Sequence, residues 1–285
     1  MSPNISPGMK AEYLSGGSRL SYVDAGDGPP LVLLHPTPLD GDYWRPLTRE
    51  LAGVRAVVPD LRGHGHSELG SDLPKGGFSR VPGAPVLTMA QLATDILALL
   101  DHLKIAKAVF GGCSIGGYVM LELWRRAPQR MRGMMFVCSK PQPDSEANLT
   151  RRMETIARAR ADGVESLFDG MAQNTVAPSV SRERPEVVSE VRAQMTLTAE
   201  AEVAVQAGLA ARPDSVPTVA TIRVPVLAIV GAEDTNVTEK EMEAFRAAPG
   251  GCELHVLPGA GHYAAYERPK KVAALMAPWL RQFAD

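Results

Sequence analysis

The sequence predicts an α/β fold in which helices flank a mostly parallel central sheet, with a helical cap inserted into it. Short apolar runs alternate with helical patterns along the chain, which is typical of parallel strands joined by crossover helices. The runs are apolar on both faces, as expected for strands that are covered by helices on both sides. A segment at about residues 141–217 shows no convincing strand and is too long for one crossover, which predicts the cap.

Six apolar runs are predicted as strands of the sheet: residues 31–34, 56–58, 108–110, 134–137, 226–230 and 254–257. Between them, Thr88 and Gln91 have the spacing of a capping box, and leucines and Ile96 follow at helical spacing. The last predicted helix begins at Pro269, and Pro278 inside its apolar stripe is expected to kink or divide it.

With 285 residues, of which 45% are hydrophobic, the chain can bury one large core. The predicted division places the core at residues 1–139 and 219–285 and the helical cap at 140–218. The Gly/Pro-rich segment 69–86 is either a flexible surface loop or a flap near the site, and its composition favours the surface loop.

Charge and cysteine content exclude several classes of protein. The chain has 32 acidic and 30 basic residues, and no basic stripe indicates nucleic acid or an anionic membrane as a partner. Cys113, Cys138 and Cys252 form no CxxC pair and no disulfide framework, which favours a reducing cytosol. Residues 1–10 lack the apolar run of a signal peptide, and no stretch reaches transmembrane length, so we predict a cytoplasmic protein.

The strongest local motif is Gly112-Cys113-Ser114-Ile115-Gly116, which matches G-x-S-x-G between a predicted strand and a predicted helix. A strand-to-helix turn this tight strains the backbone of Ser114 and leaves no space for side chains at Gly112 and Gly116. Ser114 is therefore predicted to present its hydroxyl as a nucleophile above the sheet edge.

A serine nucleophile needs a base, and the base needs an orienting carboxylate. His262 lies in a Gly-rich loop just after the last predicted strand, whereas His102 and His255 lie in a helix and a strand and are interpreted as structural. Asp234 follows the strand at 226–230; its neighbour Glu233 is expected to be solvated. The chain order Ser114, Asp234, His262 completes a predicted catalytic triad.

The oxyanion of a tetrahedral intermediate also needs donors. Ile115 supplies one N–H from the start of the helix after Ser114. In the loop that begins at His35, Pro36 and Pro38 have no N–H, so Thr37 is the predicted second donor.

Residues 60–67 read Asp-Leu-Arg-Gly-His-Gly-His-Ser. His64 and His66 could be read as metal ligands, but no nearby cysteine or acidic cluster completes a site, so no metal is predicted. Asp60 and Arg62 are expected to brace the loop instead. Cys113 is interpreted as a small buried residue.

These motifs together resemble the α/β-hydrolase superfamily over residues 18–283. Segments 35–40, 60–67 and 112–123 resemble the branch that contains 3-oxoadipate enol-lactonases, arylesterases and cofactor-free perhydrolases. The resemblance implies the α/β-hydrolase fold, with nucleophile, acid and base at Ser114, Asp234 and His262. It also implies oxyanion donors at Thr37 and Ile115.

The chain departs from the family pattern at three places. Pro36 stands where Gly or Ala is usual, Thr37 where an aromatic residue is frequent, and segment 69–86 is longer than usual. These departures affect which substrate is expected, but not which reaction chemistry is expected. The resemblance to epoxide hydrolases and haloalkane dehalogenases is limited to the fold, because those enzymes have Asp where this chain has Ser114.

We therefore predict a serine hydrolase that cleaves a small carboxylic ester or lactone through an acyl-enzyme, without cofactor or metal. The cap is expected to roof an apolar pocket, with lining candidates His35, Leu167, Phe168, Met171 and Met195. The same triad would also serve a C–C bond hydrolase, a thioesterase or an acyl transferase. A non-catalytic ligand-binding receptor on the same fold is the alternative from another class. A homodimer is compatible with the sequence.

Overall fold

The computed structural model describes residues 10–71, 73–74 and 83–284. Within them, one eight-stranded sheet has the order β1-β2-β4-β3-β5-β6-β7-β8. β2 alone runs against the others, because it pairs antiparallel with both β1 and β4 while every other pair is parallel. The strands are β1 (Ala11–Ser15), β2 (Ser18–Ala25), β3 (Pro30–Leu34), β4 (Arg55–Pro59), β5 (Ala108–Cys113), β6 (Met131–Val137), β7 (Val226–Gly231) and β8 (Cys252–Leu257).

All six predicted strands are present, and the predicted fold class, a mostly parallel sheet flanked by helices, is confirmed. β1 and β2 were not predicted from the sequence. They form a hairpin at the edge of the sheet, and β1 alternates exposed and buried residues instead of forming an apolar run. An edge hairpin with one wet face carries a weaker hydrophobic signal than a strand that is buried on both faces.

The helices fill the connections between strands. The α-helices are α1 (Arg45–Thr48), α2 (Met89–His102), α3 (Ile115–Arg126), α4 (Glu146–Asp162), α5 (Glu165–Thr175), α6 (Pro178–Glu183), α7 (Glu186–Ala193), α8 (Ala199–Ala210), α9 (Val216–Val219), α10 (Glu239–Met242), α11 (Ala264–Glu267) and α12 (Pro269–Leu280). The 3₁₀ turns are η1 (Gly41–Trp44), η2 (Pro128–Arg130), η3 (Glu243–Ala247) and η4 (Arg281–Phe283).

Two predicted helix features take a different form in the structure. Thr88 accepts a hydrogen bond from the Gln91 N–H at 3.0 Å, but the Gln91 side chain donates to Asp95, so only half of the capping box forms. Pro278 lies inside α12, which ends two residues later and continues as the 3₁₀ turn η4. The break therefore falls after the proline.

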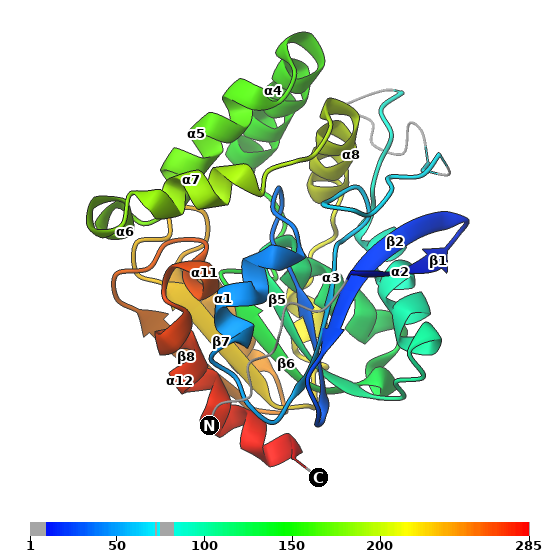
Figure 1. Cartoon of the computed structure of the whole chain (residues 1–285), viewed down its shortest axis with the longest axis vertical. Helices are drawn as coiled ribbons and strands as arrows, with labels where there is room; N and C mark the ends of the chain where they lie inside the picture. Colours follow the sequence, from blue (N-terminus) through cyan, green and yellow to red (C-terminus); the bar gives the residue numbers. More distant parts are fainter. Residues whose placement is uncertain (1–9, 72, 75–82, 285) are drawn as a thin grey trace.

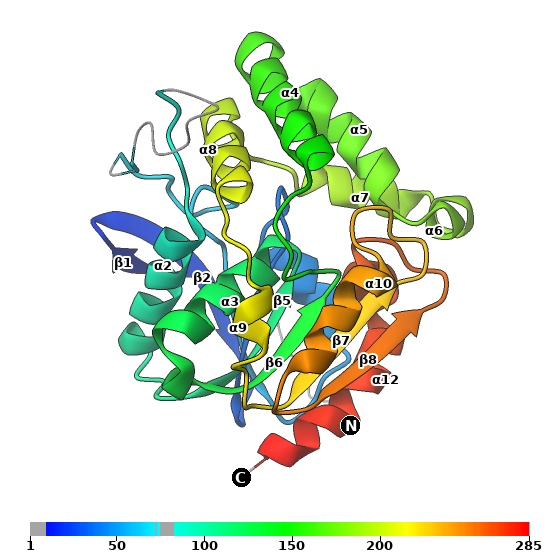
Figure 2. The ribbon, with the colours of Figure 1, turned by 180° about the vertical axis from the view of Figure 1, so that it is seen from behind.

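The sheet is covered on both faces. Figure 1 shows α1, α11 and α12 on one face, and these three helices contact one another. Figure 2, the view from behind, shows α3, α9 and α10 on the opposite face. The central strands β3, β5, β6 and β7 are almost entirely buried between these layers.

Residues 140–218, named the insertion here, lie between β6 and β7 and contain α4 to α8 and most of α9. Helices α4 to α8 gather above the sheet at one end of the molecule (Figures 1 and 2). The Ser179 N–H of the insertion donates to a Glu233 carboxylate oxygen at 2.9 Å. Glu233, which was expected to be solvated, is partly exposed and also ties α6 of the insertion to the loop after β7; its hydrogen bonds with Ser179 lower its pKa.

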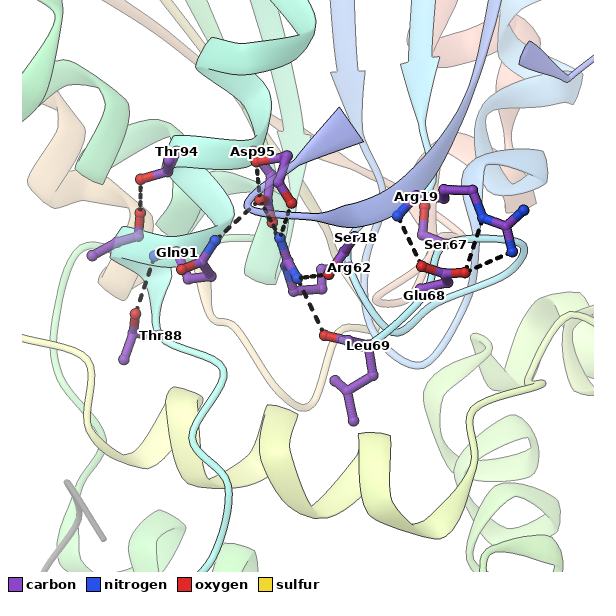
Figure 3. A network of polar contacts seen from close by, with 12 residues as sticks. Ser18, Arg19, Arg62, Ser67, Glu68, Leu69, Thr88, Gln91, Thr94 and Asp95 are labelled. Carbon is purple, nitrogen blue, oxygen red and sulfur yellow. Dashed lines mark hydrogen bonds and ion pairs between the residues drawn. The ribbon is translucent and has the colours of Figure 1, made fainter. Parts of the chain in front are cut away.

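The predicted brace around segment 60–67 is present (Figure 3). The buried Arg62 guanidinium donates to both carboxylate oxygens of the buried Asp95, each at 2.8 Å, and to Ser18 Oγ at 2.6 Å. Asp60 accepts from the N–H groups of Gly41 and His66, both at 3.0 Å. These bonds join the loop to α2, to the start of β2 and to η1.

Residues 72 and 75–82, most of the Gly/Pro-rich segment 69–86, lie outside the described residues, so the choice between surface loop and flap stays a prediction. Within the described part of the chain, no helix is long and apolar enough to cross a membrane.

Candidate active site

Ser114 occupies the turn between β5 and α3 with φ 50° and ψ −116°. A non-glycine residue in this part of the Ramachandran plot is strained, at a typical cost of about 1–3 kcal/mol. Its N–H donates to the Val137 carbonyl at 3.2 Å, and its own carbonyl accepts from the Ser139 hydroxyl at 2.9 Å. The last residue of β6 and a residue just after that strand therefore hold the strained Ser114 in place.

Two glycines make the turn sterically allowed. A Cβ at Gly112 would lie 2.5 Å from the Gly116 carbonyl carbon, and a Cβ at Gly116 would lie 2.2 Å from the Leu34 carbonyl oxygen. No side chain fits at these distances, so the motif glycines allow α3 to start directly above the ends of β3 and β5. The geometry predicted from the sequence for this turn is present.

His262 and Asp234 lie at the carboxyl ends of the neighbouring strands β8 and β7 and are joined by a hydrogen bond. The His262 Nδ1 lies 2.9 Å from Asp234 Oδ2, and the two side chains are only 8% and 0% exposed. Because an ionised carboxylate only accepts, Nδ1 carries the hydrogen and Nε2 is left as an acceptor.

The carboxylate of Asp234 is held in its charged form. Burial alone would raise its pKa, but the neighbouring His262 and the N–H groups of Asn236 and Val237 outweigh burial and lower the pKa below the ordinary value. A charged Asp234 fixes the tautomer and orientation of the imidazole.

Ser114, His262 and Thr37 line one cavity of about 300 Å³. Close packing supports this arrangement, because the Cys113 thiol next to Ser114 lies 3.6 Å from the His262 carbonyl oxygen. Cys113 itself is fully buried, as predicted, and burial raises the pKa of its thiol. The fold therefore places Ser114 and His262 on one cavity and joins Asp234 to His262, from three separate strand ends.

A carboxylate that sequence reasoning missed holds the loop of His262. The fully buried Glu267 accepts from the N–H groups on either side of the histidine, Gly261 at 2.8 Å and Tyr263 at 3.0 Å. It also accepts from the Ala177 N–H of the insertion at 3.2 Å. A lone acidic residue in a helical pattern usually indicates a solvated surface position, which is why Glu267 was not recognised.

The loop after β3 contributes Thr37 to the cavity. The Thr37 hydroxyl lies 2.9 Å from His64 Nε2, and His64 Nδ1 lies 3.0 Å from the Arg62 carbonyl. Because a carbonyl only accepts, Nδ1 of His64 is the donor and Nε2 accepts from Thr37. Burial lowers the pKa of His64 to about 4, so the ring is neutral at pH 7. His64 is thus a support for Thr37 rather than a metal ligand.

The predicted oxyanion donors have no competing partner. Within the residues that the structure describes, the N–H groups of Thr37 and Ile115 donate no hydrogen bond. Ile115 is the first residue of α3, where backbone N–H groups have no partner inside the helix.

The predicted pocket lining is corrected at four of five positions. Met171 lines the cavity, but His35, Leu167, Phe168 and Met195 do not, and all four are buried. The His35 ring accepts from the Leu61 N–H at 2.8 Å and lies 2.9 Å from the Pro36 carbonyl, so both ring nitrogens are occupied by backbone. α5, which carries Leu167 and Phe168, packs against α7 within the insertion.

The cavity is also more polar than expected. One face of α4, at i, i+3, i+4 and i+7 spacing, supplies Asn148, Arg151, Arg152 and Thr155 to the lining. The helical spacing of the apolar residues Leu149, Met153 and Ile156 predicts a helix here, and the polar residues on the adjacent face of that helix contribute to the cavity wall. Among the described residues, the lining consists of Thr37, Pro38, Ser114, Tyr118, Lys140, Asp144, Asn148, Arg151, Arg152, Thr155, Met171, Thr175, Gln206, Leu209, Asn236, Val237, His262 and Tyr263.

Among the described residues, Cys138, Asp234 and His262 are close enough together to hold a metal ion. Two of these three already bond to each other, and burial raises the pKa of the Cys138 thiol well above its ordinary value. The hydrogen bond between His262 and Asp234 orients the imidazole, as an Asp–His pair does beside a serine nucleophile.

Comparison with known proteins adds a family and several relatives. The family described as "Alpha/beta hydrolase family" matches residues 31–275. The structure is similar to that of a thermophilic esterase from Thermogutta terrifontis, with a TM-score of 0.86, 30% identity and coverage of 98% of this chain and 100% of that one. It is also similar to the enol-lactonase from Burkholderia xenovorans LB400, with a TM-score of 0.82, 26% identity and coverage of 95% and 100%.

Two curated relatives match to different extents. The 3-oxoadipate enol-lactonase 2 of Acinetobacter baylyi (strain ATCC 33305 / BD413 / ADP1) is 28% identical over 254 residues, which cover 88% of this chain and 89% of that protein. The dihydrolipoyllysine-residue acetyltransferase component of the acetoin cleaving system of Pseudomonas putida is 38% identical over 133 residues. That second match covers 46% of this chain and 32% of the relative.

Proposed function

The chain belongs to the alpha/beta hydrolase family, and from this we propose that it is a serine hydrolase that cleaves a small carboxylic ester or lactone through an acyl-enzyme. The observation that carries the proposal is the strained Ser114 in one cavity with a histidine whose Nδ1 is bound by a buried carboxylate. The similarity to an esterase and to enol-lactonases supports the ester or lactone as the bond that is cleaved.

In the proposed first step, His262 Nε2 takes the proton of the Ser114 hydroxyl while Oγ forms a bond to the substrate carbonyl carbon. The carbonyl electron pair moves onto oxygen, and the Thr37 and Ile115 N–H groups are available to stabilise that negative charge. Asp234 stays ionised and stabilises the imidazolium.

Collapse of the tetrahedral intermediate breaks the bond to the alcohol oxygen, which receives the proton from His262. Water then attacks the acyl-enzyme with His262 again as base, releasing the carboxylic acid and restoring Ser114. When the substrate is a lactone, the released alcohol and carboxylic acid groups remain in one molecule, a hydroxy acid. No step requires a group other than this chain's own residues, water and substrate.

The test is a panel of short 4-nitrophenyl esters, aryl esters, lactones and thioesters, hydrolysed by the wild type and by Ser114→Ala. Loss of a triad nucleophile can lower kcat by about a millionfold. Ser189→Ala, at an exposed serine of α7 outside the cavity lining, is the matched control and should keep full activity.

A fluorophosphonate should label the wild type at Ser114 and leave the folded Ser114→Ala variant unlabelled. Hydrolysis by Ser114→Ala at near wild-type rates would refute the proposal. So would a wild type that binds ligands but turns over none of the panel, which is the behaviour of a receptor.

A further inference from the structure

The wall of the cavity that the insertion supplies is rich in positive charge. Among the described lining residues, the side chains of Lys140, Arg151 and Arg152 are cationic, whereas Asp144 is the one carboxylate. The chain as a whole has a net charge of −2, so this concentration of cations is local.

Lys140 and Arg152 already have carboxylate partners. Lys140 Nζ forms an ion pair with Glu241. Arg152 shares Asp144 with Arg212, whose Nη2 lies 2.8 Å from Asp144 Oδ1, and Arg152 Nη1 also donates to Gln206 Oε1 at 2.8 Å. One carboxylate thus serves two guanidinium groups, which leaves about one positive charge in excess.

The buried Glu202 behind this wall is joined to Arg152 through the amide of Gln206. Its Oε1 accepts from Gln206 Nε2 at 2.8 Å, so an amide separates it from Arg152. Burial raises the pKa of Glu202, which favours its neutral form.

Arg151 differs from the other two cations. It is exposed on α4, lines the cavity, and donates to the amide oxygen of Asn148, a neutral group that also lines the cavity. A guanidinium offers five N–H donors in a planar fork that matches a carboxylate. Arg151 therefore keeps both its charge and most of its donors available on the side of the cavity.

Resting on the proposed function, we infer that the substrate carries a second, anionic group, a carboxylate, and that Arg151 binds it while Ser114 attacks the ester or lactone carbonyl. A cavity of about 300 Å³ holds a small ester with one such group. Arg151 thereby determines specificity: it selects a carboxylate-bearing substrate over a neutral one of the same shape.

The test compares substrates that differ only in charge. On the acyl side, the mono-4-nitrophenyl ester of adipic acid is compared with its primary amide. On the alcohol side, 4-carboxyphenyl butyrate is compared with 4-carbamoylphenyl butyrate. Each rate is corrected for the hydrolysis measured with Ser114→Ala. In the wild type, kcat/KM for the carboxylate should exceed that for the amide about tenfold on at least one side, as a charge-assisted pair of hydrogen bonds provides.

Three variants assign the preference to one side chain. Arg151→Gln should bring the ratio of carboxylate to amide close to one, and Arg151→Lys should retain part of it because the charge stays while the fork is lost. Arg158→Gln removes an exposed arginine of the same helix that does not line the cavity, and its ratio should equal that of the wild type. The wild-type ratio should also fall with added salt.

Failure of this inference and failure of the proposed function give different results. Equal rates for carboxylate and amide on both sides, or a preference that survives in Arg151→Gln, would overturn the carboxylate subsite and leave the serine hydrolase standing. Absence of all Ser114-dependent hydrolysis would overturn the function. In that case calorimetric binding of adipate to the wild type still tests the subsite: weakening of about tenfold in Arg151→Gln supports it, and equal binding refutes it.

Discussion

At the scale of single residues, His64 joins two motifs that lie far apart in the sequence. Its ring accepts from the Thr37 hydroxyl at 2.9 Å and is fixed from behind by the Arg62 carbonyl. Arg62 is in turn anchored by Asp95 (Figure 3). The segment 60–67 thus acts on the proposed oxyanion donor through one hydrogen bond.

Loss of an oxyanion donor typically lowers kcat by about 10²–10³-fold. His64→Ala leaves Thr37 less firmly held and should therefore lower kcat by about tenfold, with less change in KM. His66→Ala is the control: its side chain is 70% exposed, and its N–H bond to Asp60 is retained. Rates are measured per active site, titrated with a fluorophosphonate, so that a loss of folded protein does not count. Equal kcat values for the two variants would contradict the role of His64.

The sequence predicted that Ser114, Asp234 and His262 lie at one edge of the sheet, where the structure has them, because each follows a strong strand signal at an edge where parallel strands end. It failed for Leu167, Phe168 and Met195, because the pocket lining depends on how α4 and α5 are rotated against the core. Helical periodicity shows which residues share a face, as with Asn148 and Arg151, but not what that face contacts.

At the scale of elements, α11 stabilises the loop that holds the proposed base. Glu267 at the end of this short helix accepts three backbone N–H groups, two from the His262 loop and one from the insertion. In addition, Arg184 of the insertion donates to the Glu267 carbonyl. One residue thus connects the base, the core and the insertion.

Glu267→Ala should lower the free energy of unfolding by about 3 kcal/mol or more, because three buried donors lose their acceptor. Urea denaturation measures the loss, and amide hydrogen exchange at Gly261 and Tyr263 should be faster. Glu183→Ala, which removes an exposed ion pair with Arg268, should cost less than about 1 kcal/mol. A Glu267→Ala variant as stable as Glu183→Ala would show that the three hydrogen bonds contribute little.

At the scale of the whole molecule, the two ends of the insertion are tied to each other. The Ser215 N–H donates to the Pro141 carbonyl at 2.9 Å, and Asp144 near one end pairs with Arg212 near the other. Burial would raise the pKa of Asp144, but hydrogen bonds from Arg212 and Arg152 lower it to about 2. Its charged form is therefore bound more tightly in the folded than in the unfolded chain.

A lowered pKa in the folded state means stability that is present above the ordinary carboxyl pKa and is lost as the pH falls towards about 2. At pH 7, Asp144→Asn should therefore be about 2 kcal/mol less stable than the wild type, and at pH 3 the difference should shrink. Asp162→Asn, at an exposed position on α4, should match the wild type at both pH values. A difference for Asp144→Asn that does not change with pH would rule out this linkage.

The hydrogen bond between Pro141 and Ser215 also bears on how such a protein can diversify. A segment whose two ends are held side by side can be lengthened, shortened or exchanged while the spacing of β6 and β7 stays the same. The residues proposed to break the bond lie at the strand ends of the sheet, and the residue proposed to select the substrate, Arg151, lies in the insertion. Recombination at this junction would thus give an enzyme a new substrate specificity and leave the reaction that it catalyses unchanged.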